Sequence, residues 1–304
     1  MALIMSLPTH TPVMVNEAIE GLQPQPGGHF VDCTVGLGGH AQAILERILP
    51  SGRLLGIDAD PEAIRLAQVK LSDYSEAVTL VNDNFVNLEA ICRKYNFYPV
   101  DGIFLDLGIS SMQLDTAQRG FSFQREAPLD MRFDPRQELT ASDIINNLPE
   151  QELARIIKEY GEERHPRRIA KHIVRSRPIT STLRLAQVVE QVLGSKHSRI
   201  HPATRTFMAL RIAVNRELEN LKLALEQTIN LLRFHGRLVV ISYHSLEDRI
   251  VKEFMRNEAG NCTLKPISRK VIRPTSLEIE SNPRSRSAKM RIAECLKHLE
   301  KERR

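Results

Sequence analysis

The chain has 304 residues, of which 42% are hydrophobic and 26% charged, which is typical of a folded globular protein and excludes a disordered chain. This length predicts roughly two domains, and no apolar run approaches the roughly 20 residues that a membrane span needs, so we expect no membrane partner. The first 12 residues hold neither a basic start nor a signal-peptide core, so a cytoplasmic location is the expectation.

The net charge of +5 is unevenly distributed along the chain. Residues 164–216 contain 12 Lys or Arg and one acidic residue, and residues 265–304 contain 12 basic and five acidic residues, which leaves 18 basic and 31 acidic residues elsewhere. Solubility alone would select mixed signs, so these two basic segments favour a polyanionic partner such as RNA. The alternative is an ordinary solvated charged surface.

The four cysteines are far apart in the sequence and form no CxxC pair. They are Cys33, Cys92, Cys262 and Cys295. A zinc site needs clustered thiolates or imidazoles, so we expect no metal site. We interpret all four as small packing residues.

Strand and helix signals alternate over the first 110 residues. Short apolar segments predict strands over 29–33, 54–57, 78–81 and 100–105. A helix with apolar residues at helical spacing follows the first strand, and Pro61 after Asp60 opens another. This order predicts an α/β fold with a parallel sheet covered by helices on both faces.

The alternation stops near residue 114. Residues 114–204 hold no convincing strand but predict helices over 150–160, 167–175 and 183–193, an insertion of roughly 90 residues. The earlier pattern then resumes, with one long helix predicted over 207–234 and strands over 237–242 and 289–295. Ser245 with Asp248 predicts a capping box that opens a helix over 246–256.

The loop after the first strand, residues 31–40, is the most informative segment. Its glycines Gly36, Gly38 and Gly39 let the backbone approach a ligand closely and present amide donors to it. Asp58 ends the second strand, where its carboxylate could accept hydrogen bonds from both ribose hydroxyls of an adenosine. The loop alone also fits a dinucleotide site of an NAD-dependent oxidoreductase. The acidic Asp32 and the Gly-Gly-His ending, which a pyrophosphate site does not require, favour another ligand.

Two later segments lie where an open α/β sheet binds ligands, beyond the carboxyl ends of its strands. Residues 82–85 (Asn-Asp-Asn-Phe) follow the third strand and could hold an adenine by stacking on Phe85 and by amide contacts. Asp106 follows the fourth strand, with Gln113 close behind. A structural turn carboxylate is the alternative for Asp106.

Several short motifs then follow one another along nearly the whole chain. They are His10-Thr-Pro-Val-Met14, Thr34-x-Gly-x-Gly-Gly-His40, Asp58-Ala-Asp-Pro61, Leu105-Asp-Leu-Gly-Ile-Ser-Ser111 with Gln113-Leu-Asp115, Arg119-Gly-Phe-Ser-Phe123, Pro128-Leu-Asp-Met-Arg132, Tyr160-Gly-Glu-Glu-Arg164, His201-Pro-Ala-Thr-Arg-Thr-Phe207, Val214-Asn-x-Glu-Leu218, Ile241-Ser-x-His-Ser-Leu-Glu-Asp-Arg249 and Asn282-Pro-Arg-Ser-Arg-Ser287. In this ordered set the chain resembles the bacterial 16S rRNA cytosine-N4 methyltransferases, the RsmH or MraW family. It departs from the family at Met112, where proline is common, and in a short stretch between Met255 and Asn282.

The resemblance implies a Rossmann-like class I methyltransferase sheet interrupted by an all-helical domain. We expect an S-adenosylmethionine-binding domain over 1–114 and 205–304 and a helical substrate-recognition domain over 115–204. The implied cofactor is S-adenosyl-L-methionine, and the implied substrate is a cytosine in the decoding region of 16S rRNA within the small ribosomal subunit. The implied cofactor contacts are Gly38, Gly39, His40, Asp58, Phe85, Asp106 and Gln113.

Three further expectations concern mechanism. Asp106 is the candidate catalytic residue, which either binds the methionine end of the cofactor or accepts a hydrogen of cytosine N4. Phe121 and Phe123 are candidates for a clamp on a flipped base, with domain-junction packing as the alternative. The candidate phosphate contacts are Arg167, Arg168, Lys171, Arg175 and Arg205. A non-catalytic RNA-binding assembly factor and an NAD-dependent oxidoreductase remain the alternative functions.

Overall fold

The computed structural model describes residues 11–194, 201–268 and 270–298, which form two compact units. The first unit combines the segment that ends at Gly108 with the segment that begins at Leu218, and the second comprises Ile109–Glu217. His10 and the basic residues of 195–200, 269 and 299–304 lie outside the described residues. None of the helices in the described segments is long and apolar enough to cross a membrane.

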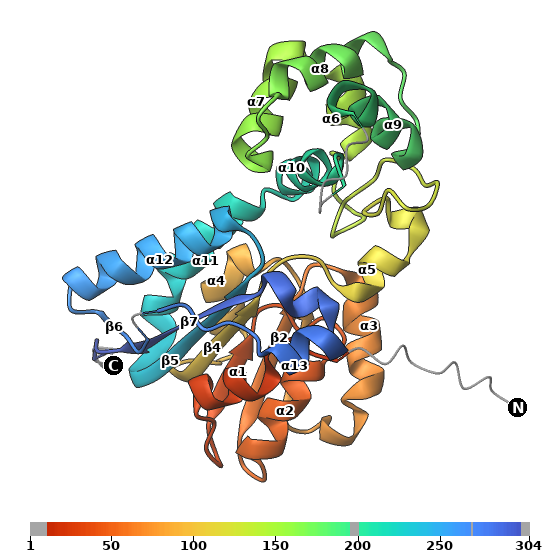
Figure 1. The fold of residues 1–304 in the computed structure, drawn as a ribbon. Helices are drawn as coiled ribbons and strands as arrows, with labels where there is room; N and C mark the ends of the chain where they lie inside the picture. The colour runs from red at the N-terminus through yellow and green to blue at the C-terminus, as the bar shows by residue number, and fades with distance from the viewer. Residues whose placement is uncertain (1–10, 195–200, 269, 299–304) are drawn as a thin grey trace, which may run out of the picture. The chain divides into compact units, whose positions relative to one another are not determined.

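A seven-stranded sheet forms the centre of the first unit, in the order β3-β2-β1-β4-β5-β7-β6 (Figure 1). The strands are β1 (His29–Asp32), β2 (Arg53–Asp58), β3 (Val78–Asn82), β4 (Val100–Asp106), β5 (Leu232–Ser242), β6 (Leu264–Pro266) and β7 (Lys289–Cys295). The first five strands run parallel, and β7 pairs antiparallel with β5 and β6. The strand order reverses between β1 and β4, so the ligand crevice is expected at their carboxyl ends.

Helices cover both faces of this sheet because its buried strands are apolar on both sides. One face packs on α1 (Val15–Leu22), α2 (Gly39–Ile48) and α3 (Pro61–Lys70), and the other on α4 (Leu88–Lys94), α11 (Glu217–Leu231) and α12 (Ser245–Gly260). In β4, Ile103 and Leu105 join one cluster and Phe104 the other, as the two-residue period of a strand requires. The predicted α/β fold class with a Rossmann-like sheet and a helical insertion is confirmed.

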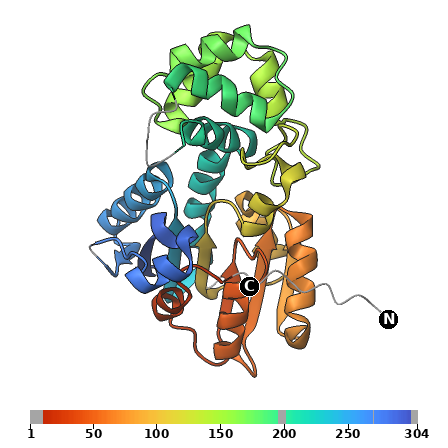
Figure 2. The same cartoon turned by 45° about the vertical axis from the view of Figure 1, so that its right-hand side comes forward.

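The second unit has its own hydrophobic cluster and is drawn in yellow, green and teal in Figure 2. Its helices are α5 (Ser111–Asp115), α6 (Ala141–Asn147), α7 (Glu150–Gly161), α8 (Pro166–Arg175), α9 (Thr182–Leu193) and α10 (Thr204–Asn215). Helix α7 packs on α8 and α10, and α8 packs on α9. Because α10 belongs to this cluster, the unit extends beyond residue 204, where the sequence predicts its end.

The single helix expected over 207–234 is wrong. The chain forms α10 and α11, separated by Arg216, which has a left-handed backbone with φ of +49°. The N–H of Arg216 donates to the carbonyl of Ile212 and ends α10. Apolar spacing continues through this break, so periodicity alone did not show it. The last residues of the expected helix instead begin β5.

The predicted role of one cysteine is also wrong. Cys33, Cys92 and Cys295 are buried, as expected for packing residues, but Cys262 is exposed. Cys262 lies after α12 with φ of +59°, in a turn that faces solvent.

Candidate functional site

The glycine loop connects β1 to α2 in the conformation that only its glycines accept readily. Gly36 and Gly38 have φ of +51° and +81°, and Gly38 is the residue before the first turn of α2. The N–H of Gly36 donates to Asp58 Oδ2 at 2.8 Å, which ties the loop to the end of β2. The left-handed backbone explains why these positions need glycine.

Asp58 is held by the backbone on both sides of its carboxylate. Besides the bond from Gly36, its Oδ1 accepts from the N–H of Asp60 at 2.9 Å. These two bonds fix the orientation of the carboxylate at the end of β2. The geometry is compatible with the ribose contact expected from the sequence.

The end of β3 contributes a polar turn followed by Phe85. Asn82 Nδ2 donates to the carbonyls of Asp58 and Ala59 at 2.9 and 3.0 Å, and Asn84 Oδ1 accepts from the N–H of Val86. The Asn82 amide therefore holds the end of β3 to the end of β2, whereas the Asn84 side chain stabilises the turn that contains Phe85. Phe85 is half-buried against the core of the first unit.

Asp32 is fully buried at the end of β1. Its Oδ1 accepts from the N–H of Thr34 at 3.1 Å, whereas Oδ2 has no hydrogen-bond partner among the described residues. Burial, together with the charges of Asp106 and Asp58, raises the pKa of Asp32 to about 8. A buried carboxyl oxygen without a partner is costly, so the position suits a cationic ligand group.

His40 in the first turn of α2 links the glycine loop to the N-terminal segment. Its Nε2 lies 2.9 Å from the carbonyl of Val13, and because a carbonyl only accepts, Nε2 carries a proton. The other ring nitrogen, Nδ1, lies 3.8 Å from Asp106 Oδ2. The ring packs on Phe104 with a centroid distance of 4.6 Å. His40 is thus fixed with one nitrogen toward Asp106.

Asp106 lies at the end of β4 and is contacted from three directions. Its N–H donates to Thr34 Oγ1 at 2.7 Å, and its Oδ1 accepts from the Tyr243 hydroxyl at 2.8 Å. Burial raises the pKa of Asp106 to about 7, the Tyr243 hydrogen bond opposes this rise, and the charge of Glu247 adds to it. Asp106 can therefore change its charge near neutral pH, as an acid–base catalyst must.

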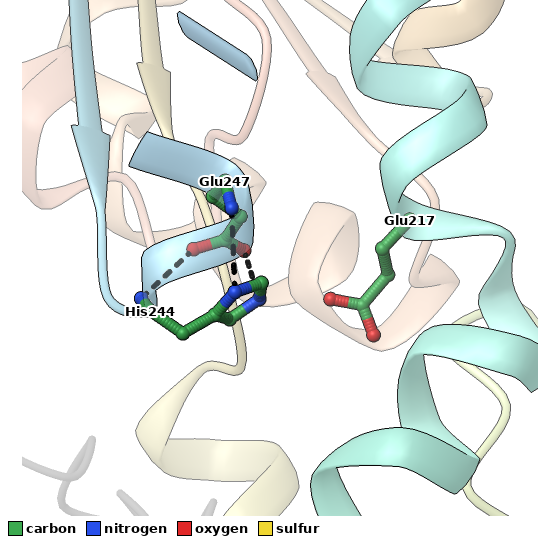
Figure 3. Close-up of side chains that lie close together, drawn as sticks. All are labelled: Glu217, His244 and Glu247. Atoms are coloured by element: carbon green, nitrogen blue, oxygen red, sulfur yellow. Dashed lines mark hydrogen bonds and ion pairs between the residues drawn. The ribbon is translucent and has the colours of Figure 1, made fainter. Parts of the chain in front are cut away.

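The residues after β5 include one that the sequence analysis missed. Tyr243 occupies the variable position of the Ile-Ser-x-His-Ser motif, so its contact with Asp106, 137 residues away, gave no local signal. The predicted capping box of Ser245 and Asp248 is wrong. His244 is the cap of α12, its Nδ1 accepts from the N–H of Glu247, and their side chains lie 3.1 Å apart (Figure 3). Local spacing favoured the serine one position later.

Gln113, the remaining predicted cofactor contact, belongs to the second unit. It is buried in α5, where its N–H donates to Ser110 Oγ and its Oε1 accepts from the Ser110 N–H. The structure thus brings Gly38, Gly39, His40, Asp58 and Asp106 to the carboxyl ends of β1, β2 and β4 in the first unit, and places Gln113 in a capping box of the second.

The two candidate clamp residues pack inside the second unit. Phe121 is buried and stacks on Phe133 at 5.6 Å between ring centroids. Phe123 is half-buried, stacks on His201 at 4.4 Å and meets the edge of Phe207. Phe121 belongs to the hydrophobic cluster of this unit, and Phe123 packs against that cluster.

Helix α8 carries most of the predicted phosphate contacts on one face. Its buried side packs Ile169, Ala170 and Ile173, while Arg167, Arg168, Lys171 and Arg175 are exposed. Within the described segments none of these four cations forms an ion pair with an acidic side chain. Arg205 is exposed at the start of α10 and donates to the carbonyl of Glu162. An unneutralised cationic face of this kind suits a polyanion.

The chain is similar in sequence to several known proteins. A ribosomal RNA small subunit methyltransferase H from Dehalococcoides mccartyi is 56% identical over 300 residues, covering 94% of this chain and 86% of the relative. The proteins of the same name from Thermotoga neapolitana and Syntrophotalea carbinolica are 50% and 48% identical, covering 94% and 93% of this chain and 96% of each relative. The model of the MraW methylase family matches residues 8–296. The chain therefore belongs to the MraW methylase family.

Proposed function

We propose that this protein transfers a methyl group from S-adenosyl-L-methionine to N4 of a cytosine in the decoding region of 16S rRNA, within the small ribosomal subunit. Relatives named ribosomal RNA small subunit methyltransferase H, which share about half of its residues over nearly the whole chain, support the rRNA substrate. The observation that carries the chemistry is Asp106, a titratable carboxyl that is partly exposed at the end of β4 and fixed on both sides. The cytoplasmic location expected from the sequence accords with a ribosomal substrate.

The residues at the strand ends fit this cofactor. S-adenosylmethionine supplies a methyl carbon bonded to a positively charged sulfur, which a nucleophile displaces. Asp58 would accept the ribose hydroxyls, and the buried Asp32, whose Oδ2 has no partner among the described residues, would balance a cationic group. Gly38, Gly39 and His40 would contact the cofactor where it approaches the backbone of the loop. Phe85 would pack on its adenine.

We assign to Asp106 the role of accepting the proton that cytosine N4 loses. The amino group of cytosine is a weak nucleophile, and it must lose one proton when the nitrogen gains a methyl group. A carboxylate that accepts a hydrogen bond from N4 localises the nitrogen lone pair and then takes this proton. The pKa of Asp106, raised to about 7 by burial, suits both accepting and releasing a proton near neutral pH.

The second unit is the proposed substrate-recognition part. The exposed cations of α8, with Arg205 of α10, would contact phosphates and hold the RNA without reading its sequence. Such contacts release counterions, so binding should weaken steeply as salt rises.

The direct test is methyl transfer from labelled S-adenosylmethionine to small ribosomal subunits that lack the modification, followed by nucleoside analysis of the rRNA. Labelled N4-methylcytidine would support both the cofactor and the reaction. An Asp106→Asn variant should bind the subunit as the native chain does but lose most of its turnover. If this variant kept both its cofactor affinity and its rate, neither role of Asp106 would stand.

Three other outcomes identify the alternatives. If the cofactor binds but no label enters the RNA, the assignment as a methylase would stand and the assigned substrate would be wrong. RNA binding without cofactor binding would favour an assembly factor, and binding of NAD in place of S-adenosylmethionine would favour an oxidoreductase.

A further inference from the structure

Tyr243 donates a side-chain hydrogen bond to the Asp106 carboxylate. Its hydroxyl lies 2.8 Å from Asp106 Oδ1, and its ring packs over Gly108. A Cβ at Gly108 would lie 3.2 Å from Tyr243 Cδ2, and Gly108 has φ of +98°, so glycine at this position leaves room for the ring. The N–H of Tyr243 also donates to Glu247 Oε2 at 2.9 Å, which fixes its backbone.

We propose that Tyr243 is a positioning residue for methyl transfer, whose hydroxyl holds the Asp106 carboxylate in place and in its charged form. The proposal rests on the function assigned to Asp106 above. None of the other titratable neighbours among the described residues donates a hydrogen bond to Asp106 Oδ1. They either repel the charge of the carboxylate or approach its other oxygen, Oδ2. Glu247 of α12 and Asp32 of β1 are acidic, and His40 of α2 faces Oδ2 at 3.8 Å.

The chemistry of the tyrosine supports this role. Burial, the neighbouring Asp106 carboxylate with its hydrogen bond, and the charges of Glu247 and of Glu278 in α13 (Ser276–Ser281) raise the pKa of Tyr243 well above its ordinary value. The phenol therefore stays protonated throughout the neutral range and always donates. Burial raises the pKa of Asp106, and the bond from Tyr243 is the influence that lowers it. Without this bond, a larger fraction of Asp106 would be protonated and unable to accept a proton from N4.

The test replaces only the hydroxyl, in Tyr243→Phe. The titration of Asp106 is followed by carbon-13 NMR of its carboxyl group in the protein without cofactor, and Asp106→Asn assigns the signal. We expect the pKa of Asp106 to rise by about one unit, the size of a lost hydrogen bond to a charged group. The apparent pKa of the acidic limb in the pH profile of methyl transfer should rise by the same amount. Most of the rate should be recovered at high pH. Tyr74→Phe is the matched control, because the Tyr74 hydroxyl reaches Glu46 on the surface at 3.5 Å.

A second variant guards against simple misfolding. Replacing Tyr243 with 3-fluorotyrosine keeps the ring and makes the hydroxyl a stronger donor, so the Asp106 titration and the acidic limb should both move to lower pH. An unchanged Asp106 pKa in both variants, or an equal loss of rate at every pH, would overturn the proposal. If Asp106→Asn is inactive while these profiles do not move, the role of Asp106 survives and the role of Tyr243 fails.

Discussion

The ring of Pro12 packs directly on Gly39, so that a Cβ added to Gly39 would lie 2.4 Å from Pro12 Cγ. Pro12 belongs to the segment whose next residue, Val13, accepts the hydrogen bond from His40. The N-terminal segment and the first turn of α2 are therefore fitted to each other at the glycine loop. Glycine is required here by this close approach and not by its backbone conformation, because Gly39 has an ordinary φ.

Gly39→Ala should displace either Pro12 or the start of α2. We expect the affinity for S-adenosylmethionine to fall about tenfold or more and the stability to drop by about 1–3 kcal/mol, as for overpacked cores. Calorimetric titration with the cofactor and thermal unfolding measure the two effects. Gly260→Ala is the matched control, since nothing lies within 4 Å of a Cβ there. Unchanged affinity in Gly39→Ala would show that the loop does not depend on this contact.

Asp32 should make the stability of the protein without cofactor depend on pH. Burial raises the pKa of Asp32 from 3.8 to about 8, so between these values the folded chain holds a proton that the unfolded chain has released. The free energy of unfolding should therefore fall as pH rises through this window and level off above it. Asp32→Asn removes the part of this slope that Asp32 contributes and should raise the Tm by roughly 2–6 °C at the alkaline end. Thermal scans across pH measure it, and Asp73→Asn, at an exposed position, should leave the slope unchanged.

We expect Asp32 and Asp106 to release protons when the cofactor binds. A cationic ligand favours the charged forms of Asp32 and Asp106, whose pKa values of about 8 and about 7 would fall when it binds. Affinity for S-adenosylmethionine should thus weaken as pH drops below these values, by up to about tenfold per pH unit for each proton released. Titration calorimetry in buffers of different ionisation enthalpy counts the protons. A pH-independent affinity with no proton release would place the cationic group of the cofactor elsewhere.

The elements that the sequence predicts well are those whose signal is local. Strands β1 to β4 are expected within one or two residues of their observed ends, because apolar runs and the polar residues after them mark both limits. Asp58 and Asp106 stand out for the same reason, since each ends a strand. Parallel strands bring their carboxyl ends to one edge of a sheet, so the strand pattern alone also predicts that these two carboxylates share that edge.

What the sequence does not predict depends on contacts between distant residues or on uncommon local choices. Tyr243 meets Asp106 across 137 positions, and no pattern marks such a pair. Histidine is not a preferred helix cap, so the local pattern favours Ser245 over His244. The break at Arg216 occurs without glycine or proline, and the packing of α10 on α7 extends the second unit beyond its expected end.

The exposed cations of α8 should determine the salt dependence of RNA binding. Replacing Arg167, Lys171 and Arg175 with glutamine removes three positive charges from the exposed face of the helix and leaves its buried side unchanged. If each contacts one phosphate, the slope of log affinity against log salt should become shallower by about 2–3. Filter binding to small subunits at several salt concentrations measures it. The control triple variant removes Lys222, Lys252 and Arg256, exposed cations of the first unit, and should leave the slope as it was.

Asn215 should be a major determinant of the stability of the second unit. The residue is 3% exposed, its Oδ1 accepts from the N–H of Phe133 at 2.7 Å, and its Nδ2 donates to the carbonyls of Met131 and Arg211 at 2.8 and 2.9 Å. Asn215→Ala leaves buried backbone groups without partners, which should cost about 2–4 kcal/mol. Hydrogen exchange should then accelerate at the amide of Phe133, and the Tm should fall.

Asn215→Asp separates the two halves of this contact. A carboxylate can still accept from Phe133 but cannot donate to the carbonyl of Met131, and it faces that carbonyl with a second acceptor. This variant should therefore be at least as unstable as Asn215→Ala near neutral pH and recover stability in acid, where a protonated carboxyl can donate again. Equal stability of Asn215→Asp and the native chain would mean that packing, and not the paired hydrogen bonds, secures residues 131–133 to α10. Asn257→Ala, at an exposed position of α12, should change neither the Tm nor this pH dependence.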